Sequence, residues 1–482
     1  MLPRTMEAST QSGLRLIALG LALGLAGQAL FYSAGLGLNV LLWMGVLIAA
    51  AFLVIKPGNG DRDWATIGAL LLGSGSIAMN DSPWIVSLNA LFILGTFGLY
   101  AFKTASAQSR PTLSRLLVMA ACAWAQFWLE AFKVGSSLKW DELKPTDGKG
   151  QNVRAVGRGI ALAIPAVVLF MCLMSSADPV FSRLLTPHIE VNAEAVIVRT
   201  WIAILTGLFA VGFLRRATTP RVVTPPLPDS ELGSPTQLGR VEFITVFATL
   251  SALVAGFVVV QGRYLFGGSD VVLATEGMSY AQYARRGFFE LVSLVAIAVP
   301  MVLGAIGMVR ESNRTVRVTS AVFLGLIGLV LISAGKRMEL YVGAYGLSEL
   351  RFYVSASMAW LAALLVLVAL AILGRKLNRL PRSLGWSIAG AIALVSFANP
   401  DRIIAEYNLN RTSGEIVLDH SYLASLGGGS VEPLLRALPR LPKEQQHSIE
   451  NELEYRYSGP ERDWRDWNYQ AAKARKSYHR AR

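Results

Sequence analysis

The chain has 482 residues, of which 53% are hydrophobic and only 16% are charged, and its formal net charge is +13. A soluble domain carries roughly a quarter charged residues, so this composition excludes water as the main solvent of the chain. Many of the lysines and arginines stand in short connections beside apolar blocks, which is the distribution expected from membrane topology. We therefore expect no nucleic-acid partner.

The apolar residues come in blocks of mostly about 16 to 23 residues, which as helices cross roughly 30 Å of hydrocarbon. The blocks are continuously apolar rather than alternating, which excludes a β-barrel and leaves helices as the spanning structure. The sequence therefore predicts an all-α, polytopic transmembrane helical bundle of about eleven spans. In chain order these are residues 14–32, 38–55, 64–79, 83–102, 159–176, 196–214, 241–260, 287–309, 319–334, 352–373 and 384–397.

Residues 113–132 are the ambiguous apolar stretch, because Trp124, Trp128 and Glu130 interrupt it and many lysines and arginines follow it. If this stretch spanned the membrane as a twelfth helix, those cations would lie outside. The positive-inside rule instead favours an interfacial or re-entrant helix, within a cytoplasmic basic region at 103–158.

The charges of the other connections predict the orientation. The Pro-rich linker at 215–240 and the connections at 310–317 and 375–382 are basic and fall on one side of the membrane. The connection at 335–351 is also basic and opposes this scheme. On balance we expect a cytoplasmic N-terminus and an extracytoplasmic C-terminus.

The composition divides the chain into a transmembrane domain at 1–399 and a polar C-terminal tail at 400–482. The apolar spacing in the tail predicts three short helices, with a break at Gly427-Gly428-Gly429. The basic end of the tail, residues 473–482, is expected to be a solvated terminus, and the alternative is that it lies against lipid head groups. The predicted tail helices are residues 419–426, 430–438 and 443–455.

Ionisable residues near the spans are the best functional indicators, because a charge inside hydrocarbon costs roughly 2.5 to 3.5 kcal/mol or more. Glu290 lies about one turn inside its span, and Tyr283 and Arg286 share its helical face. This group is interpreted either as a substrate, lipid or proton site, or as an Arg286–Glu290 ion pair that fixes the helix end.

A second polar group follows the span at 319–334 and is expected to share one outward-facing pocket with the first. The alternative is ordinary snorkelling of charged side chains in an interfacial aromatic belt. The candidate functional cluster consists of Tyr283, Arg285, Arg286, Glu290, Lys336, Arg337 and Glu339.

No motif for a metal, a nucleotide or a catalytic nucleophile stands in the sequence. The four histidines are scattered, and the two cysteines, Cys122 and Cys172, lie inside apolar stretches. A His-Glu-x-x-His pair, a Cys-x-x-Cys pair, a phosphate-binding loop and a Gly-x-Ser-x-Gly elbow are all missing. We therefore expect no metal, no cofactor and no catalytic constellation.

Four phrases of the sequence resemble a bacterial membrane family labelled domain of unknown function 4173, which is related to the one labelled 4153. The resemblance extends from roughly the third span to residue 438, and it implies a bacterial inner membrane location but no activity. The phrases are SADPVF at 176–181, YAQYARRGFFEL at 280–291, AEYN at 405–408 and LDHSYL at 418–423.

Three functional hypotheses follow, and a membrane protein of undetermined activity with a transport-related or assembly role ranks first. The second is a membrane enzyme acting on a lipid-linked or phosphate-bearing substrate at the outer face. Its phosphate-binding cations would be Arg285, Arg286, Lys336 and Arg337, and its acid/base would be Glu290 or Glu339. The third is a scaffold or sensory protein whose tail contacts a protein partner. Membrane lipids are expected partners in every case.

Overall fold

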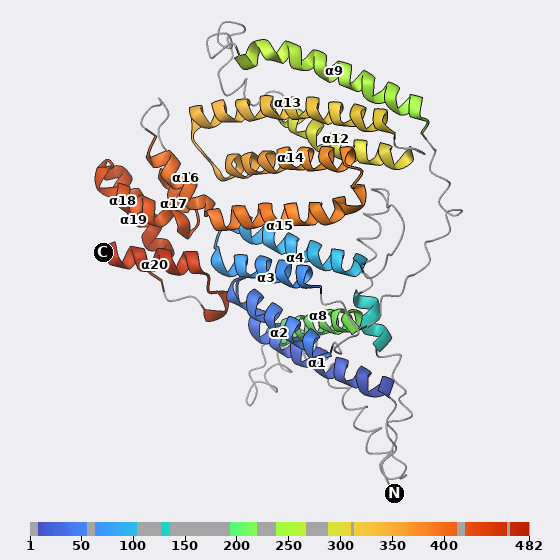
Figure 1. Ribbon diagram of the computed structural model, residues 1–482. Coiled ribbons are helices and arrows are strands. Elements are labelled where there is room, and N and C mark those ends of the chain that lie inside the picture. The colour runs from blue at the N-terminus through green and yellow to red at the C-terminus, as the bar shows by residue number, and fades with distance from the viewer. Residues whose placement is uncertain are drawn as a thin grey trace, which may run out of the picture.

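The computed structural model describes residues 8–54, 63–103, 127–134, 193–218, 238–266, 288–309, 313–411, 420–459 and 463–481. Every named element in these ranges is a helix. The long helices lie side by side in a stack, and a cluster of short helices covers one end of it (Figure 1).

Among the described residues, ten apolar helices make up the stack, and their bounds lie within six residues of the predicted spans, except that the helix predicted at 319–334 continues to Tyr345 and so includes polar residues expected in a connection. They are α1 (Ala8–Phe31), α2 (Leu38–Val54), α3 (Trp64–Met79), α4 (Pro83–Lys103), α8 (Ala193–Thr218), α9 (Arg240–Phe266), α12 (Phe288–Met308), α13 (Arg314–Tyr345), α14 (Glu349–Leu373) and α15 (Leu380–Ala398).

Among the described helices, six are long and apolar enough to cross a membrane, namely α1, α8, α9, α12, α13 and α14. Helices α2, α3 and α4 contribute shorter apolar segments, and α15 forms a pair with the next helix that is bent by 52°. The structure therefore supports a membrane-embedded helical protein without establishing about eleven spans. The predicted span at 159–176 lies outside the described residues.

Helices α1 and α8 approach each other closely along a row of small residues. A Cβ atom on Gly24 would stand 2.5 Å from the carbonyl oxygen of Ala203, and one on Gly207 would stand 2.9 Å from that of Gly20. Small residues at such contacts let helix backbones pack tightly where lipid supplies no hydrophobic driving force.

Two apolar cores divide the stack into halves. One core joins α1–α4, α8 and the short helical segment at 127–134, and the other joins α9, α12, α13, α14 and the start of α15. Helix α15 also packs on α3 and α4, where the buried Asn89 donates a hydrogen bond of 2.9 Å from Nδ2 to Ser396 Oγ. Helix α15 therefore connects the two halves.

The described part of the ambiguous stretch packs into the first half. Phe127, Ala131 and Val134 are buried there, and Glu130 accepts a hydrogen bond of 2.9 Å from the Arg215 guanidinium of α8. Gly212 of α8 permits this approach, because a Cβ there would collide with the backbone of Phe127. Residues 113–126 lie outside the described residues, so the predicted interfacial or re-entrant helix stays a prediction.

The tail folds into a small helical domain, which we call the C-terminal domain. Ile404, Leu423, Leu434 and Leu453 are almost fully buried in its core, together with Tyr478 near the chain end. Its elements are α16 (Pro400–Leu409), α17 (His420–Ser425), η3 (Gly428–Ser430), α18 (Val431–Ala437), η4 (Leu438–Arg440), α19 (Lys443–Tyr457), η5 (Trp464–Asp466) and α20 (Tyr469–Ala481).

The basic end of the chain is helix α20, so the expectation of a solvated terminus is wrong. Ala474 and Tyr478, four residues apart, point to one side of this helix and are buried in the core of the C-terminal domain. The many lysines and arginines around them mask this short apolar face in the sequence.

We predict that Gly24→Val destabilises the first half of the bundle by about 1 to 3 kcal/mol, because the added side chain forces α1 away from α8. Thermal unfolding of the purified protein in detergent measures the effect. The control is Gly45→Val in α2, where a Cβ meets no atom within 4 Å. Equal melting temperatures for the two variants would contradict the close α1–α8 contact.

Candidate functional site

The C-terminal domain meets the membrane helices at a buried cluster of polar side chains, which we call the polar junction. It forms where the α3–α4 turn, the start of α14 and the α15–α16 joint reach the C-terminal domain (Figure 1). The polar junction consists of Asp81, Ser82, Glu349, Tyr353, Asp401 and Tyr422.

Asp81 ties the membrane domain to the C-terminal domain. The end of α3 holds it in place, because Asn80 turns its side-chain amide back to the Ser76 carbonyl at 2.9 Å. Both carboxylate oxygens of Asp81 then accept the backbone N–H of Gly428, at 3.0 and 2.8 Å. Hydrogen bonds to an ionised acceptor are among the strong ones in proteins.

Asn399 makes the joint that carries Asp401 into the junction. Its backbone is in the left-handed region, with φ of 55°. The same residue is the C-cap of α15 and the N-cap of α16. Asparagine tolerates this conformation, and the following Pro400 suits the first position of a new helix. The bend of 52° that results separates α16 from the span and assigns it to the C-terminal domain.

The glycine turn of the C-terminal domain fits closely against this joint. A Cβ atom on Gly429 would collide with the side-chain oxygen of Asn399, and one on Gly427 would collide with a carboxylate oxygen of Asp401. The Gly427 position also borders a carboxylate oxygen of Asp81. Only glycine permits this approach. The sequence predicts a helix break at this turn, and the structure shows that the turn is also a close contact with the α15–α16 joint.

Asp401 is the most perturbed acid of the junction. It is only 3% exposed, and burial, followed by the charges of Asp81 and Glu349, raises its pKa to about 7. Arg456 opposes this shift, but its guanidinium is hydrogen-bonded to the carbonyl of Ala424 at 2.7 Å. Asp401 Oδ1 has no hydrogen-bond partner among the described residues.

Tyr422 links the junction to the start of α14. Its phenol oxygen accepts the backbone N–H of Glu349 at 2.8 Å. Burial, and then the nearby charges of Glu349 and Asp401, raise the pKa of Tyr422, whereas its hydrogen bond from Glu349 lowers it. The tyrosine therefore stays protonated at neutral pH.

Two further contacts hold the C-terminal domain on the bundle. Asn408 of α16 exchanges two hydrogen bonds with the backbone of Leu347, at 2.9 and 2.6 Å. At the α1–α2 turn, Arg465 donates to the carbonyl of Tyr32 at 3.0 Å, and Leu38 N–H donates to the carbonyl of Trp467 at 2.9 Å. Both halves of the bundle are thus attached to the same domain.

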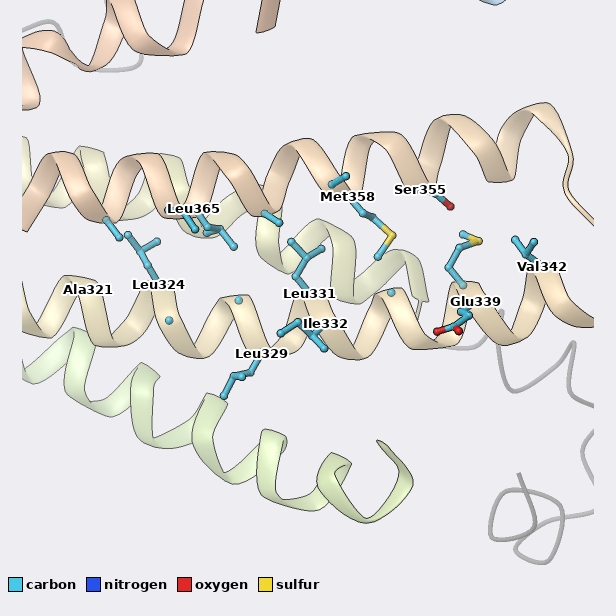
Figure 2. Close-up of a pocket in the computed structure, with 18 of the residues that line it drawn as sticks. Ala321, Leu324, Leu329, Leu331, Ile332, Glu339, Val342, Ser355, Met358 and Leu365 are labelled. Carbon is cyan, nitrogen blue, oxygen red and sulfur yellow. The ribbon is translucent and has the colours of Figure 1, made fainter. Parts of the chain in front are cut away.

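A second candidate site is an apolar groove between α13 and α14, which we call the α13–α14 groove. It has a volume of about 760 Å³ and is lined mainly by aliphatic side chains and glycines. Figure 2 shows Leu324, Leu331 and Leu365 within the groove, with Glu339 and Ser355 toward one end. Tyr407 of α16 also lines it, so the groove reaches the C-terminal domain.

The structure brings together only part of the predicted functional cluster. Tyr283, Arg285 and Arg286 lie outside the described residues, so the predicted pairing of Arg286 with Glu290 is a prediction still. Glu290 is exposed in the first turn of α12.

The remaining members of that cluster lie on α13. Lys336 and Glu339 form an ion pair of 2.7 Å, and Glu339, unlike Lys336 or Arg337, lines the α13–α14 groove. The described residues thus place this pair at the end of a groove, while the pocket shared with residues 280–290 stays a prediction.

Among the described residues, no three histidine, cysteine, aspartate or glutamate side chains are grouped so that they could hold a metal ion.

Sequence reasoning did not join the residues of the polar junction into one site. Its acids stand at 81, 349 and 401, so nothing in local spacing joins them. The Asn399-Pro400-Asp401 triplet at the end of an apolar block was the one available signal, because Asn-Pro marks a chain turn.

The chain matches the model of a family described as a domain of unknown function (DUF4153), over residues 67–437. The related label 4173, expected from the four phrases, is not shown. The match includes every residue of the polar junction and ends with α18, before α19 and α20. No curated protein and no solved structure matches the chain.

We predict that Gly429→Ala weakens the attachment of the C-terminal domain by about 1 to 3 kcal/mol, because the methyl group displaces Asn399. Limited proteolysis of the purified protein, followed at the tail, measures the loosening. Gly459→Ala is the matched control, since a Cβ there meets no atom within 4 Å. A variant that resists protease as well as this control would show that the close fit at the joint is unimportant.

Proposed function

Because the chain belongs to the DUF4153 family of domains of unknown function, which supplies no activity, we propose a role from the polar junction. The protein is an integral membrane protein with a transport-related or membrane-assembly role, and protonation controls how its C-terminal domain closes one end of the bundle. The single observation that carries this proposal is the burial of Asp401 beside Asp81 and Glu349 where the two domains meet.

The direction of the pH effect follows from the pKa of Asp401. In the docked state this pKa is raised from 3.8 to about 7, so the docked domain holds a proton that the undocked domain releases. The stability that this proton gives to docking is therefore full below pH 3.8 and is lost as the pH rises from 3.8 to about 7. Above that value both states have lost the proton, and the stability no longer changes through this group.

Charged and titratable groups from every neighbouring element face Asp401. Asp81 comes from the α3–α4 turn, Glu349 and Tyr353 from α14, Tyr422 from α17, and Arg456 from α19. The carboxylates of Asp81 and Glu349 outweigh Arg456 and favour the protonated form of Asp401. Like charges in a low dielectric cannot all remain ionised without large cost.

The distribution of basic residues supports an orientation for this proposal. The α1–α2, α3–α4 and α13–α14 turns lie at the C-terminal domain. The opposite ends of these helices therefore lie on the other side of the bundle. That opposite side has the arginines and lysines at the end of α8, at the starts of α9 and α13 and just after α14. By the positive-inside rule it is cytoplasmic, so the N-terminus is inside and the C-terminal domain is outside a bacterial inner membrane. The described cations there are Arg215, Arg216, Arg240, Arg314, Arg317, Arg375, Lys376 and Arg379.

The alternative functions receive less support from the described residues. An outer-face enzyme was expected to bind phosphate with Arg285 and Arg286 together with Lys336, and these two arginines lie outside the described residues. A scaffold with an unattached tail is disfavoured, because the C-terminal domain packs on both halves of the bundle. A protein partner on its outer face is compatible with the proposal.

We predict that attachment of the C-terminal domain is at least tenfold stronger at pH 5 than at pH 8, and that Asp401→Asn abolishes this dependence. The uncharged amide keeps the domain docked at both pH values. Hydrogen exchange of amides in α17 and α18, in the purified protein, measures the opening. Exposed Glu444→Gln is the control and leaves the wild-type dependence intact.

The proposal fails if opening of the domain is equal at pH 5 and pH 8 in the wild-type protein. It also fails if Asp401→Asn keeps the wild-type pH dependence, since another group would then be responsible.

We also predict that Ser458→Cys in the C-terminal domain reacts with a membrane-impermeant maleimide on intact cells, whereas Asn378→Cys reacts only after permeabilisation. Both positions are exposed, and both variants are made in a chain whose two native cysteines are replaced by serine. The reverse labelling pattern would place the C-terminal domain in the cytoplasm.

A further inference from the structure

We propose that the α13–α14 groove binds a phospholipid whose headgroup contains both a phosphate and an ammonium group, with the acyl chain along the groove and the headgroup at Lys336 and Glu339. This site is separate from the polar junction and would exist whether or not docking depends on pH.

The shape of the groove suits a single hydrocarbon chain. Its floor is aliphatic, while small residues such as Gly328 and Ala362 line its walls. No atom lies within 4 Å of a Cβ placed on Gly328, so its wall faces open space. Along α14 the lining runs from Ser355 to Ala369, about 20 Å of helix. One leaflet of hydrocarbon is about 15 Å thick, so an acyl chain fits the length of the groove.

The volume favours a lipid chain over a partner helix. The groove has a volume of about 760 Å³, whereas a helix is about 10 to 12 Å across and would lie against the groove from outside rather than within it. Ligand sites of small molecules have volumes of roughly 300 to 1,000 Å³, which includes this value.

The charges at one end of the groove specify the headgroup. Glu339 lines the groove, and Lys336 lies one helical turn before it. The exposed fractions of their side chains are 61% for Lys336 and 69% for Glu339, so solvent screens their ion pair and it contributes little to stability. An ammonium group beside Glu339 and a phosphate beside Lys336 would replace this weak pair with two complementary contacts.

Tyr407 adds an aromatic side chain at the same end. It comes from α16, lines the groove and is 43% exposed. Tyrosine is enriched at the level of lipid headgroups, where its ring is apolar and its hydroxyl is wet. The groove therefore passes from an apolar floor to an interfacial tyrosine and a charge pair, which is the order of groups in a phospholipid.

The test uses the full-length protein in detergent, mixed with phosphatidylethanolamine or phosphatidylglycerol and measured by native mass spectrometry. We expect at least fivefold more phosphatidylethanolamine than phosphatidylglycerol on the wild-type protein. Gly328→Leu and Ala362→Leu, which fill the groove from opposite walls, each reduce bound phosphatidylethanolamine at least fivefold. Gly307→Leu on α12, where a Cβ also meets open space, leaves it unchanged.

Glu339→Gln tests the headgroup and is expected to reduce the preference between the two lipids at least threefold. Equal binding of the two lipids by the wild-type protein would overturn the proposal, as would unchanged lipid binding in both groove-filling variants that retain the wild-type melting temperature. If the wild-type protein forms oligomers, and the two groove-filling variants lose them while their bound lipid is unchanged, the proposal would also be overturned, in favour of a helix of a second copy in the groove.

Discussion

The architecture depends on burying acidic groups where the two domains meet. A carboxyl group buried beside two others is costly when ionised, and the cost falls when it is protonated or when its neighbours are hydrogen-bonded. Here the charge of Asp81 is stabilised by the Gly428 N–H. Asp401 has a raised pKa, so protonation removes its charge. The junction is therefore stable only while both domains supply their parts.

The two candidate sites differ in the physics they use. The polar junction relies on burial and charge, and it connects the C-terminal domain to both halves of the bundle through helix α15. The α13–α14 groove relies on shape in the hydrocarbon and uses charge only at its end. Glu339 lies at that end and Tyr407 connects it to the C-terminal domain, so lipid binding and docking share one helix, α16.

Sequence reasoning predicted the apolar helices well, because lipid requires continuous apolar segments and their ends are marked by charge. Helix α3, for example, has the predicted bounds of Trp64–Met79. The sites were predicted poorly, because Asp81, Glu349 and Asp401 come together only through tertiary packing. The end of α20 was misjudged for a related reason, since Ala474 and Tyr478 form an apolar face only when a partner surface exists.

The contacts of the C-terminal domain also set an order for biosynthesis. Arg465 donates hydrogen bonds to carbonyls at the end of α1, across a sequence separation of 433 to 436 residues. Helix α1 therefore gains these hydrogen bonds only after more than 430 further residues have been synthesised. Until then the carbonyls of Ala29 and Tyr32 lack the Arg465 guanidinium, so the contact between α1 and the C-terminal domain forms late in synthesis.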